Sequence, residues 1–110
     1  MEEVLKLAEQ LGRAVAETER YKAMRTAEKA VAADPEAKAL DEEYTRVAMK
    51  IQELEVAGKP IEPEDKRALQ SAKEKLAADP KIQELTRAWA DYNEMIARIN
   101  SLVFEKLGKD

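Results

Sequence analysis

Apolar residues recur along most of the chain at alternating spacings of three and four, which is typical of one face of an α-helix. The repeat is unbroken in residues 35–57 and again in residues 80–107. The apolar positions are Ala37, Leu40, Tyr44, Val47, Ile51 and Leu54 in the first segment, and Ile82, Leu85, Trp89, Tyr92, Ile96, Ile99 and Val103 in the second. Each set forms one apolar row along its helix, which we call a seam, and such rows suit near-antiparallel helix packing. No segment alternates as a strand does, so the sequence predicts an all-α protein.

Two Ala-Ala-Asp-Pro tetrapeptides, at residues 32–35 and 77–80, predict sharp corners between helices. Proline pushes the residue before it out of the helical region, and it is favoured at the first position of a new helix. Aspartate is a strong N-cap because its carboxylate accepts hydrogen bonds from the first backbone N–H groups. Asp34 and Asp79 are therefore the predicted N-caps of the next helices.

These corners divide the chain into four predicted helices. They span about 2–33, 35–57, 63–78 and 80–107, with one loop at 58–62. At about 1.5 Å per residue the first helix would be about 45 Å long, whereas a compact chain of this size has a radius of gyration of about 13 Å. We therefore expect an elongated helical bundle, with residues 1–110 forming a single domain.

The last predicted helix carries more apolar surface than one seam needs. Ala88, Met95 and Leu102 form a second row one position before the seam, and Phe104 extends it. A helix with so wide an apolar face is covered on two sides. Either the first helix covers both rows or a second subunit covers one of them. Because exposed apolar side chains forfeit burial energy, we expect a homodimer with Met95, Leu102 and Phe104 in or near its interface.

The chain of 110 residues contains no cysteine and no histidine. This excludes disulfides, thiolate catalysis, imidazole acid–base chemistry and metal sites that need sulfur or imidazole. The acidic residues 41–43 are better explained by the helix dipole than by a bound cation. We predict no catalytic residues, no cofactor, no metal and no small-molecule substrate, and hence a protein that is not an enzyme.

The charges also argue against nucleic acid as a partner. There are 19 basic and 23 acidic residues, a formal net charge of −4, whereas phosphate binders usually show a basic excess. Arg20, Lys22, Arg25 and Lys29 form the most basic stretch, but interspersed glutamates favour a solvated face with ion pairs. No run of 18 apolar residues predicts a membrane span, and the acidic start is unlike a signal peptide. The cytoplasm is the expected compartment.

Five further residues allow two interpretations each. Trp89 and Tyr92 are either anchors of a partner surface or seam positions, and their register favours the seam. Asn93 and Asn100 lie seven residues apart and so share one side of the helix. Asparagine at such positions either fixes the register of paired helices or lies at a solvent-exposed margin. Gly12 either permits a close helix crossing or is a tolerated cost of about 1 kcal/mol.

The order of these features resembles the YlbF/YmcA family of small bacterial helical proteins, and within it the YheA-type branch. The resemblance rests on Tyr21-Lys22-Ala23-Met24 in the long first helix and on Ala33-Asp34-Pro35-Glu36 after it. It continues with a heptad helix, a glycine-containing turn, the second Asp-Pro corner and a final amphipathic helix. It covers residues 4–107.

The resemblance implies an all-α cytoplasmic protein of Gram-positive-type bacteria that is often dimeric. Relatives are non-enzymatic regulatory partners in complexes that influence mRNA processing, competence, sporulation and biofilm formation. The implied function is thus a regulatory or adaptor subunit that binds other proteins, the alternatives being a self-associating structural module or a weak RNA-binding protein. Some relatives supply cysteines to an iron–sulfur cluster, but this chain has no cysteine for that purpose.

Overall fold

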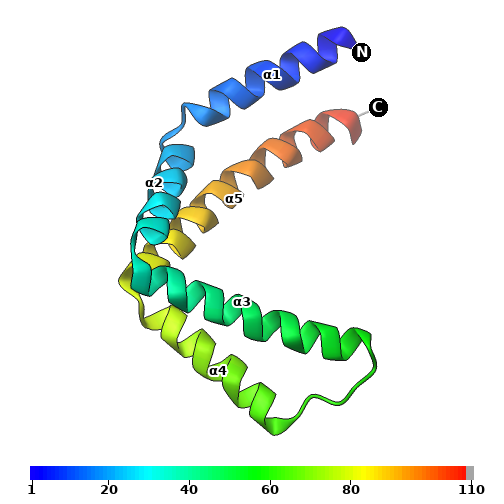
Figure 1. Ribbon diagram of the computed structural model, residues 1–110. Helices are drawn as coiled ribbons and strands as arrows, with labels where there is room; N and C mark the ends of the chain where they lie inside the picture. The colour runs from blue at the N-terminus through cyan, green and yellow to red at the C-terminus, as the bar shows by residue number, and fades with distance from the viewer. Residues whose placement is uncertain (109–110) are drawn as a thin grey trace. The chain divides into compact units, whose positions relative to one another are not determined.

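The computed structural model of the protein describes residues 1–108, in which five α-helices follow one another with short connections (Figure 1). The helices are α1 (Glu2–Ala16), α2 (Glu19–Ala33), α3 (Pro35–Val56), α4 (Pro63–Ala78) and α5 (Pro80–Gly108). No strand occurs within residues 1–108. The predicted all-α class is confirmed, but the predicted number of four helices is wrong.

The extra helix arises because the predicted helix 2–33 is interrupted at Glu17 and Thr18. The Thr18 hydroxyl donates to the Val15 carbonyl at 2.7 Å and accepts from the Tyr21 backbone N–H at 3.2 Å. The second of these is the bond an N-cap makes, so threonine ends one helix and begins the next. The predicted uninterrupted helix of about 45 Å is therefore two shorter helices of 15 residues each.

The helices belong to two compact units, whose boundaries lie within α2 and within α5. Unit 1 comprises Met1–Glu28 and Leu85–Asp110, of which residues 109–110 are outside the described part. Unit 2 comprises Lys29–Glu84. The expectation of a single domain over 1–110 stays a prediction.

In unit 2, α3 and α4 form an antiparallel hairpin (Figure 1). Ala37 and Ala72 are almost fully buried, because alanine lets two helix backbones approach closely, and Val47 is buried with them. Ion pairs join the two helices at the margins. Lys50 Nζ lies 2.9 Å from an oxygen of Asp65, and Lys75 Nζ lies 3.6 Å from an oxygen of Glu43.

The hairpin turns at Gly58, which has a φ of +69° that other residues rarely adopt. The Lys59 N–H donates to the Leu54 carbonyl at 2.9 Å, and the Gly58 N–H donates to the Glu55 carbonyl at 3.1 Å. These two bonds make a Schellman motif, which satisfies the last carbonyl groups of α3.

The two Asp-Pro corners have the same local geometry. The Asp34 carboxylate accepts from the backbone N–H groups of Glu36 and Ala37, at 2.9 and 3.3 Å. Asp79 accepts in the same way from Lys81 and Ile82, at 2.9 and 3.0 Å. The second oxygen of Asp34 also lies 2.8 Å from Lys81 Nζ, so an ion pair joins the first corner to the start of α5.

In unit 1, α2 packs against α5 around Met24, Ala27 and Ala88, which are buried. Tyr21, Leu85 and Tyr92 pack against this small core. At its edge Arg20 forms an ion pair with Glu94 and donates to the Asp91 carbonyl at 3.1 Å. The contact between α2 and α5 therefore combines close packing at two alanines with the polar interactions of Arg20.

Three carboxylates have pKa values below their ordinary range, chiefly because each accepts a hydrogen bond from a cationic side chain. The pairs are Asp34 with Lys81, Asp65 with Lys50, and Glu94 with Arg20. The hydrogen bond to Asp34 also raises the pKa of Lys81.

These shifts predict how stability depends on pH. A carboxyl group with a lowered pKa stabilises the fold above its unfolded pKa, and this stabilisation is lost as the pH falls through the folded pKa. A lysine with a raised pKa loses its contribution only as the pH rises past its folded value. With no histidine, we expect a constant melting temperature from about pH 6 to 9 and a fall below about pH 4. Thermal melts followed by circular dichroism check this, and a clear shift between pH 6 and 8 would contradict it.

Candidate functional site

Helix α1 has a wide apolar face that the rest of unit 1 does not cover. It is 15 residues long and has no buried residue. Its polar side chains gather on the opposite side, so the helix is strongly amphipathic. The exposed large apolar residues are Val4, Leu5, Leu7 and Leu11. A face of this kind normally packs against another element, and here most of it is in contact with solvent.

The C-terminal half of α5 is similarly open. Leu102, Val103, Phe104 and Leu107 are all exposed, with Leu102 at 57% and Phe104 at 67%. Met95, about two turns before Leu102, is half-buried. The structure therefore leaves two of the three predicted interface residues in solvent and partly covers the third. Whether they form an interface stays a prediction.

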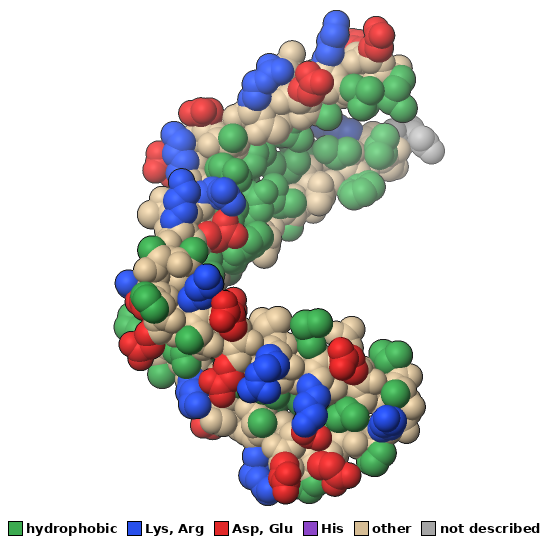
Figure 2. Space-filling model, viewed as in Figure 1, with side chains coloured by type: hydrophobic (Ala, Val, Ile, Leu, Met, Phe, Trp, Pro, Cys, Tyr) green, Lys and Arg blue, Asp and Glu red, His purple; other side chains and the backbone are tan. Residues whose placement is uncertain are grey.

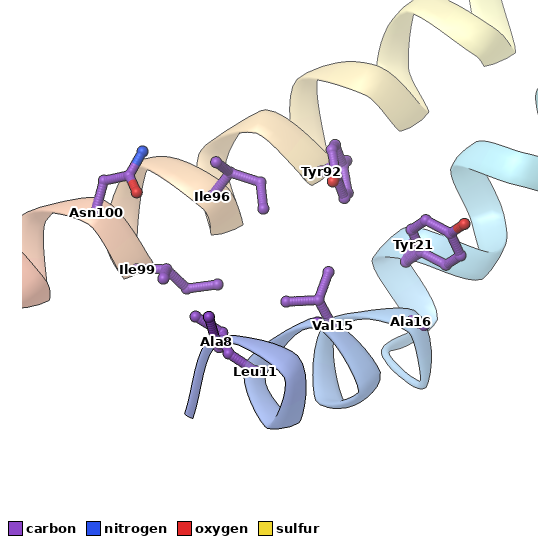
Figure 3. A pocket seen from close by; sticks show the side chains of 10 residues that line it. Ala8, Leu11, Val15, Ala16, Tyr21, Tyr92, Ile96, Ile99 and Asn100 are labelled. Atoms are coloured by element: carbon purple, nitrogen blue, oxygen red, sulfur yellow. The ribbon is translucent and has the colours of Figure 1, made fainter. Parts of the chain in front are cut away.

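A pocket of about 420 Å³ lies between these two helices (Figure 3). Most of its lining is apolar and comes from both sides of the gap. The lining residues are Ala8, Leu11, Gly12, Val15 and Ala16 of α1, Tyr21 of α2, and Tyr92, Ile96, Ile99 and Asn100 of α5. Figure 2 shows hydrophobic side chains gathered along the facing sides of α1 and α5. We call this set, together with the exposed apolar residues of the two helices, the α1–α5 face.

The α1–α5 face consists mainly of apolar side chains, which can pack against a partner but cannot catalyse a reaction. Its polar groups are the Asn100 amide and the hydroxyls of Tyr21 and Tyr92, whose rings lie 6.0 Å apart. None of these is an activated nucleophile or a base with a partner to orient it. An apolar, open face of this kind suits the apolar side of another helix.

Trp89 lies at the margin of the unit 1 core and is 37% exposed. Its ring meets Tyr92 edge to face at 5.7 Å, an arrangement that stabilises aromatic pairs. Tyr92 is half-buried and lines the pocket. Tyr92 is therefore partly covered, as its position in the apolar row predicts. Trp89 occupies the same row but remains partly exposed to solvent.

The basic stretch of α2 is largely engaged in ion pairs. Arg20 pairs with Glu94, Lys22 lies 3.5 Å from Glu17, and Arg25 lies 3.0 Å from Glu28. Ion pairing of this kind agrees with a solvated face rather than a phosphate-binding one.

The acidic residues predicted to complement the dipole of α3 do not converge on one point. Glu43 faces Lys75 of α4. Within residues 1–108, no group of three or more His, Cys, Asp or Glu side chains is arranged as a metal site requires.

Gly12 does not mark a close crossing within the chain. A methyl group added there would meet no atom within 4 Å, and the residue lines the open pocket instead. Asn100 is exposed and lines the same pocket, while Asn93 is exposed nearby on α5. A close approach at Gly12 would need an element from outside the chain.

The contribution of α1 to this site was missed from the sequence. The predicted interface residues all lie on α5, and none of them is on α1. The signal was present in Leu5 and Ala8, which widen the apolar face of α1 beyond a single seam. Leu107 extends the open face of α5 in the same way.

None of the described helices is long and apolar enough to cross a membrane.

The fold matches two solved structures closely. One is the crystal structure of Bacillus subtilis RicA in complex with RicF, with a TM-score of 0.78 over 92% of this chain and 90% of that chain at 18% identity. The other is a protein of unknown function (DUF964) from Bacillus stearothermophilus, with a TM-score of 0.78, 20% identity and coverage of 94% and 91%. At such low identity these likenesses show the fold.

Sequence relatives cover nearly the whole chain. A UPF0342 protein of Streptococcus gordonii is 31% identical over 107 residues, which are 97% of this chain and 96% of the relative. A UPF0342 protein of Lactobacillus helveticus is 32% identical over 92 residues, covering 84% and 79%. The sequence model of one family, described as "Control of competence regulator ComK, YlbF/YmcA", matches residues 4–108. The chain therefore belongs to the YlbF/YmcA family.

Proposed function

We propose that the protein is a non-enzymatic regulatory or adaptor subunit that binds other proteins through helix–helix contacts. The observation that carries this proposal is the α1–α5 face, which exposes eight large apolar side chains around an open pocket. A monomeric protein rarely exposes a large contiguous apolar patch unless something binds there. The family description names a regulator rather than a reaction, which supports the same function.

A structural neighbour supports a protein as the partner. RicA, whose fold this chain shares, was crystallised in complex with the protein RicF. We propose that this chain likewise works inside a protein complex, in the cytoplasm, and that it belongs to the YheA-type branch. RNA is the less supported partner, because at least three of the four basic residues on α2 already form ion pairs.

The same proposal includes self-association along α5. Phe104 and Leu102 are exposed and Met95 is half-buried, so all three are available in or near an interface between two copies. If self-association is the whole function, no other protein binds the face. This is the alternative of a self-associating structural module.

A pull-down from native lysate at mild salt, with identification by mass spectrometry, separates these two functions. We expect at least one protein to be retained reproducibly, to bind again when purified, and to be lost with the variant Leu7→Glu on the α1–α5 face. Met49→Glu is the matched control, because Met49 is exposed to a similar extent but lies on α3 in unit 2. If no purified protein rebinds the parent chain, the adaptor function is wrong and the structural module remains.

A further inference from the structure

Helix α1 is the least buried helix of the described chain. Of the five helices within residues 1–108, it is the only one without a buried residue. Residues 2–14 are all exposed, and only Val15 and Ala16, at the C-terminal end of the helix, are half-buried. Most of the stability of a helix in a protein comes from the packing of its apolar face. Helix α1 therefore depends mainly on its own backbone hydrogen bonds.

The sequence of α1 makes such a helix only marginally stable. It has 15 residues, and a helix of about 12–15 residues that stands alone is marginal in water. Gly12 lies in its interior, where glycine is the least favourable residue after proline. The N-cap residue, Met1, makes no side-chain hydrogen bond to the first turn. The acidic first turn and one exposed ion pair, Arg13 with Glu9 at 3.6 Å, offset little of this.

The junction between α1 and α2 lets α2 begin without α1. Glu17 and Thr18 are the two residues between these helices. The Thr18 hydroxyl caps α2 by accepting from the Tyr21 N–H, and the Thr18 carbonyl accepts from the Lys22 N–H at 3.1 Å. Both bonds lie within residues 18–22, so neither of them requires α1 to be helical. The folding of α1 can therefore separate from the folding of α2 at this junction.

We propose that α1 is an arm which folds and unfolds on its own while no partner is bound, and that this local equilibrium controls access to the α1–α5 face. When α1 is unfolded, the pocket loses the five of its ten lining residues that α1 supplies (Figure 3). A partner meets the complete face only in the fraction of chains whose α1 is helical, and its apparent affinity is reduced by that fraction. Folding of α1 is thus a limit on binding that the proposed function does not include.

Amide hydrogen exchange on the full chain tests this directly. It is measured at a concentration at which light scattering gives the mass of one copy, on the Phe104→Glu variant if the parent chain pairs. We expect the amides of residues 6–16 to be protected less than about tenfold. The amides of Ala27 and Ala88, which are buried in the core of unit 1, should be protected more than about a thousandfold. Equal protection of the two sets would overturn the inference.

The substitution Gly12→Ala changes the stability of the arm alone. A methyl group at this position meets no atom within 4 Å, so it adds no contact and acts only on the helix itself. Because alanine favours a helix over glycine, we expect the protection of residues 6–16 to rise about two- to fivefold. The protection of Ala27 and Ala88 should stay the same and is the internal control. No rise, or an equal rise in both sets, would contradict an arm that folds on its own.

Two proline substitutions test the independence of α1 in a second way. Lys6 and Ala23 are both exposed and are the fifth residues of α1 and α2. Proline inside a helix breaks it, but of these two helices only α2 contributes to the buried core.

Thermal melts of both variants are followed by the fluorescence of Trp89, which lies in unit 1. We expect Lys6→Pro to lower the melting temperature by less than about 3 °C and Ala23→Pro to lower it by more than about 10 °C. Similar losses in the two variants would show that α1 folds together with the rest of unit 1, and would overturn the inference. Neither the exchange measurement nor the melts need a partner, so their failure is distinguishable from a failure of the pull-down.

Discussion

Replacing Phe104 by glutamate is expected to weaken self-association by at least about a hundredfold. Each copy loses the burial of one phenylalanine, worth about 1.5–3 kcal/mol, and the two-fold contact doubles the loss to about 3–6 kcal/mol. This corresponds to a dissociation constant raised by about 10²–10⁴. Sedimentation equilibrium over a range of concentrations measures the change. The helix content should stay the same, because Phe104 is exposed in the single chain.

The matched control for this variant is Met49→Glu. Met49 is an exposed apolar residue of α3 in unit 2 and lies outside the α1–α5 face. M49E introduces the same side chain away from α5, so its dissociation constant should stay within a few-fold of the parent value. An equal loss in both variants would show a general effect of charge, and an unchanged F104E variant would remove Phe104 from the interface.

Replacing Met24 by alanine is expected to have the largest effect on folding of any single truncation. Met24 is the largest of the three buried residues at the contact of α2 with α5, beside Ala27 and Ala88. Truncating a buried methionine costs about 2–5 kcal/mol, while a domain of this size has only about 5–15 kcal/mol of net stability. The buried neighbours Ala27 and Ala88 have little side chain to move into the gap, and the larger side chains that pack against this core would fill it only in part.

Urea unfolding of M24A can be followed at one fixed protein concentration, because self-association would otherwise change the apparent stability. Trp89, the only tryptophan, lies in unit 1 and reports on that unit by fluorescence, while circular dichroism reports on all helices. Met49→Ala is the control, since Met49 is 53% exposed and should change stability by less than about 0.5 kcal/mol. Equal losses in the two variants would contradict the small core described above.

The corners of this fold could be predicted because local chemistry determines them. The helices after Asp34 and Asp79 begin at Pro35 and Pro80 as predicted, and the helix after the loop begins at Pro63. Proline and aspartate act on the backbone within three residues, so no tertiary information was needed.

The break at Glu17 and Thr18 shows why other local signals are missed. The apolar register of the first predicted helix continues from Val15 through Thr18 to Tyr21, and neither proline nor glycine interrupts it. Threonine is tolerated within helices and also caps them, so its presence alone does not decide between the two. Its hydroxyl bonds to Val15 and Tyr21 are visible only in the structure.

The candidate site could be predicted in part. The surplus of apolar residues on α5 pointed to Leu102 and Phe104, which are exposed. The pocket was not predictable, because it depends on how far α1 stands from α5 at Leu11, Val15 and Ile99. That separation is a property of the packing of whole helices, and no spacing within one segment encodes it.

The mass of the unmutated chain in solution tests the central claim most directly. The claim is that the α1–α5 face is a binding surface which a second copy covers when no other partner is present. One copy has a mass of 12.4 kDa. Light scattering on chromatographically purified protein at micromolar concentration should therefore give twice this value. A mass of one copy at the same concentration, with the helix content intact, would contradict the account.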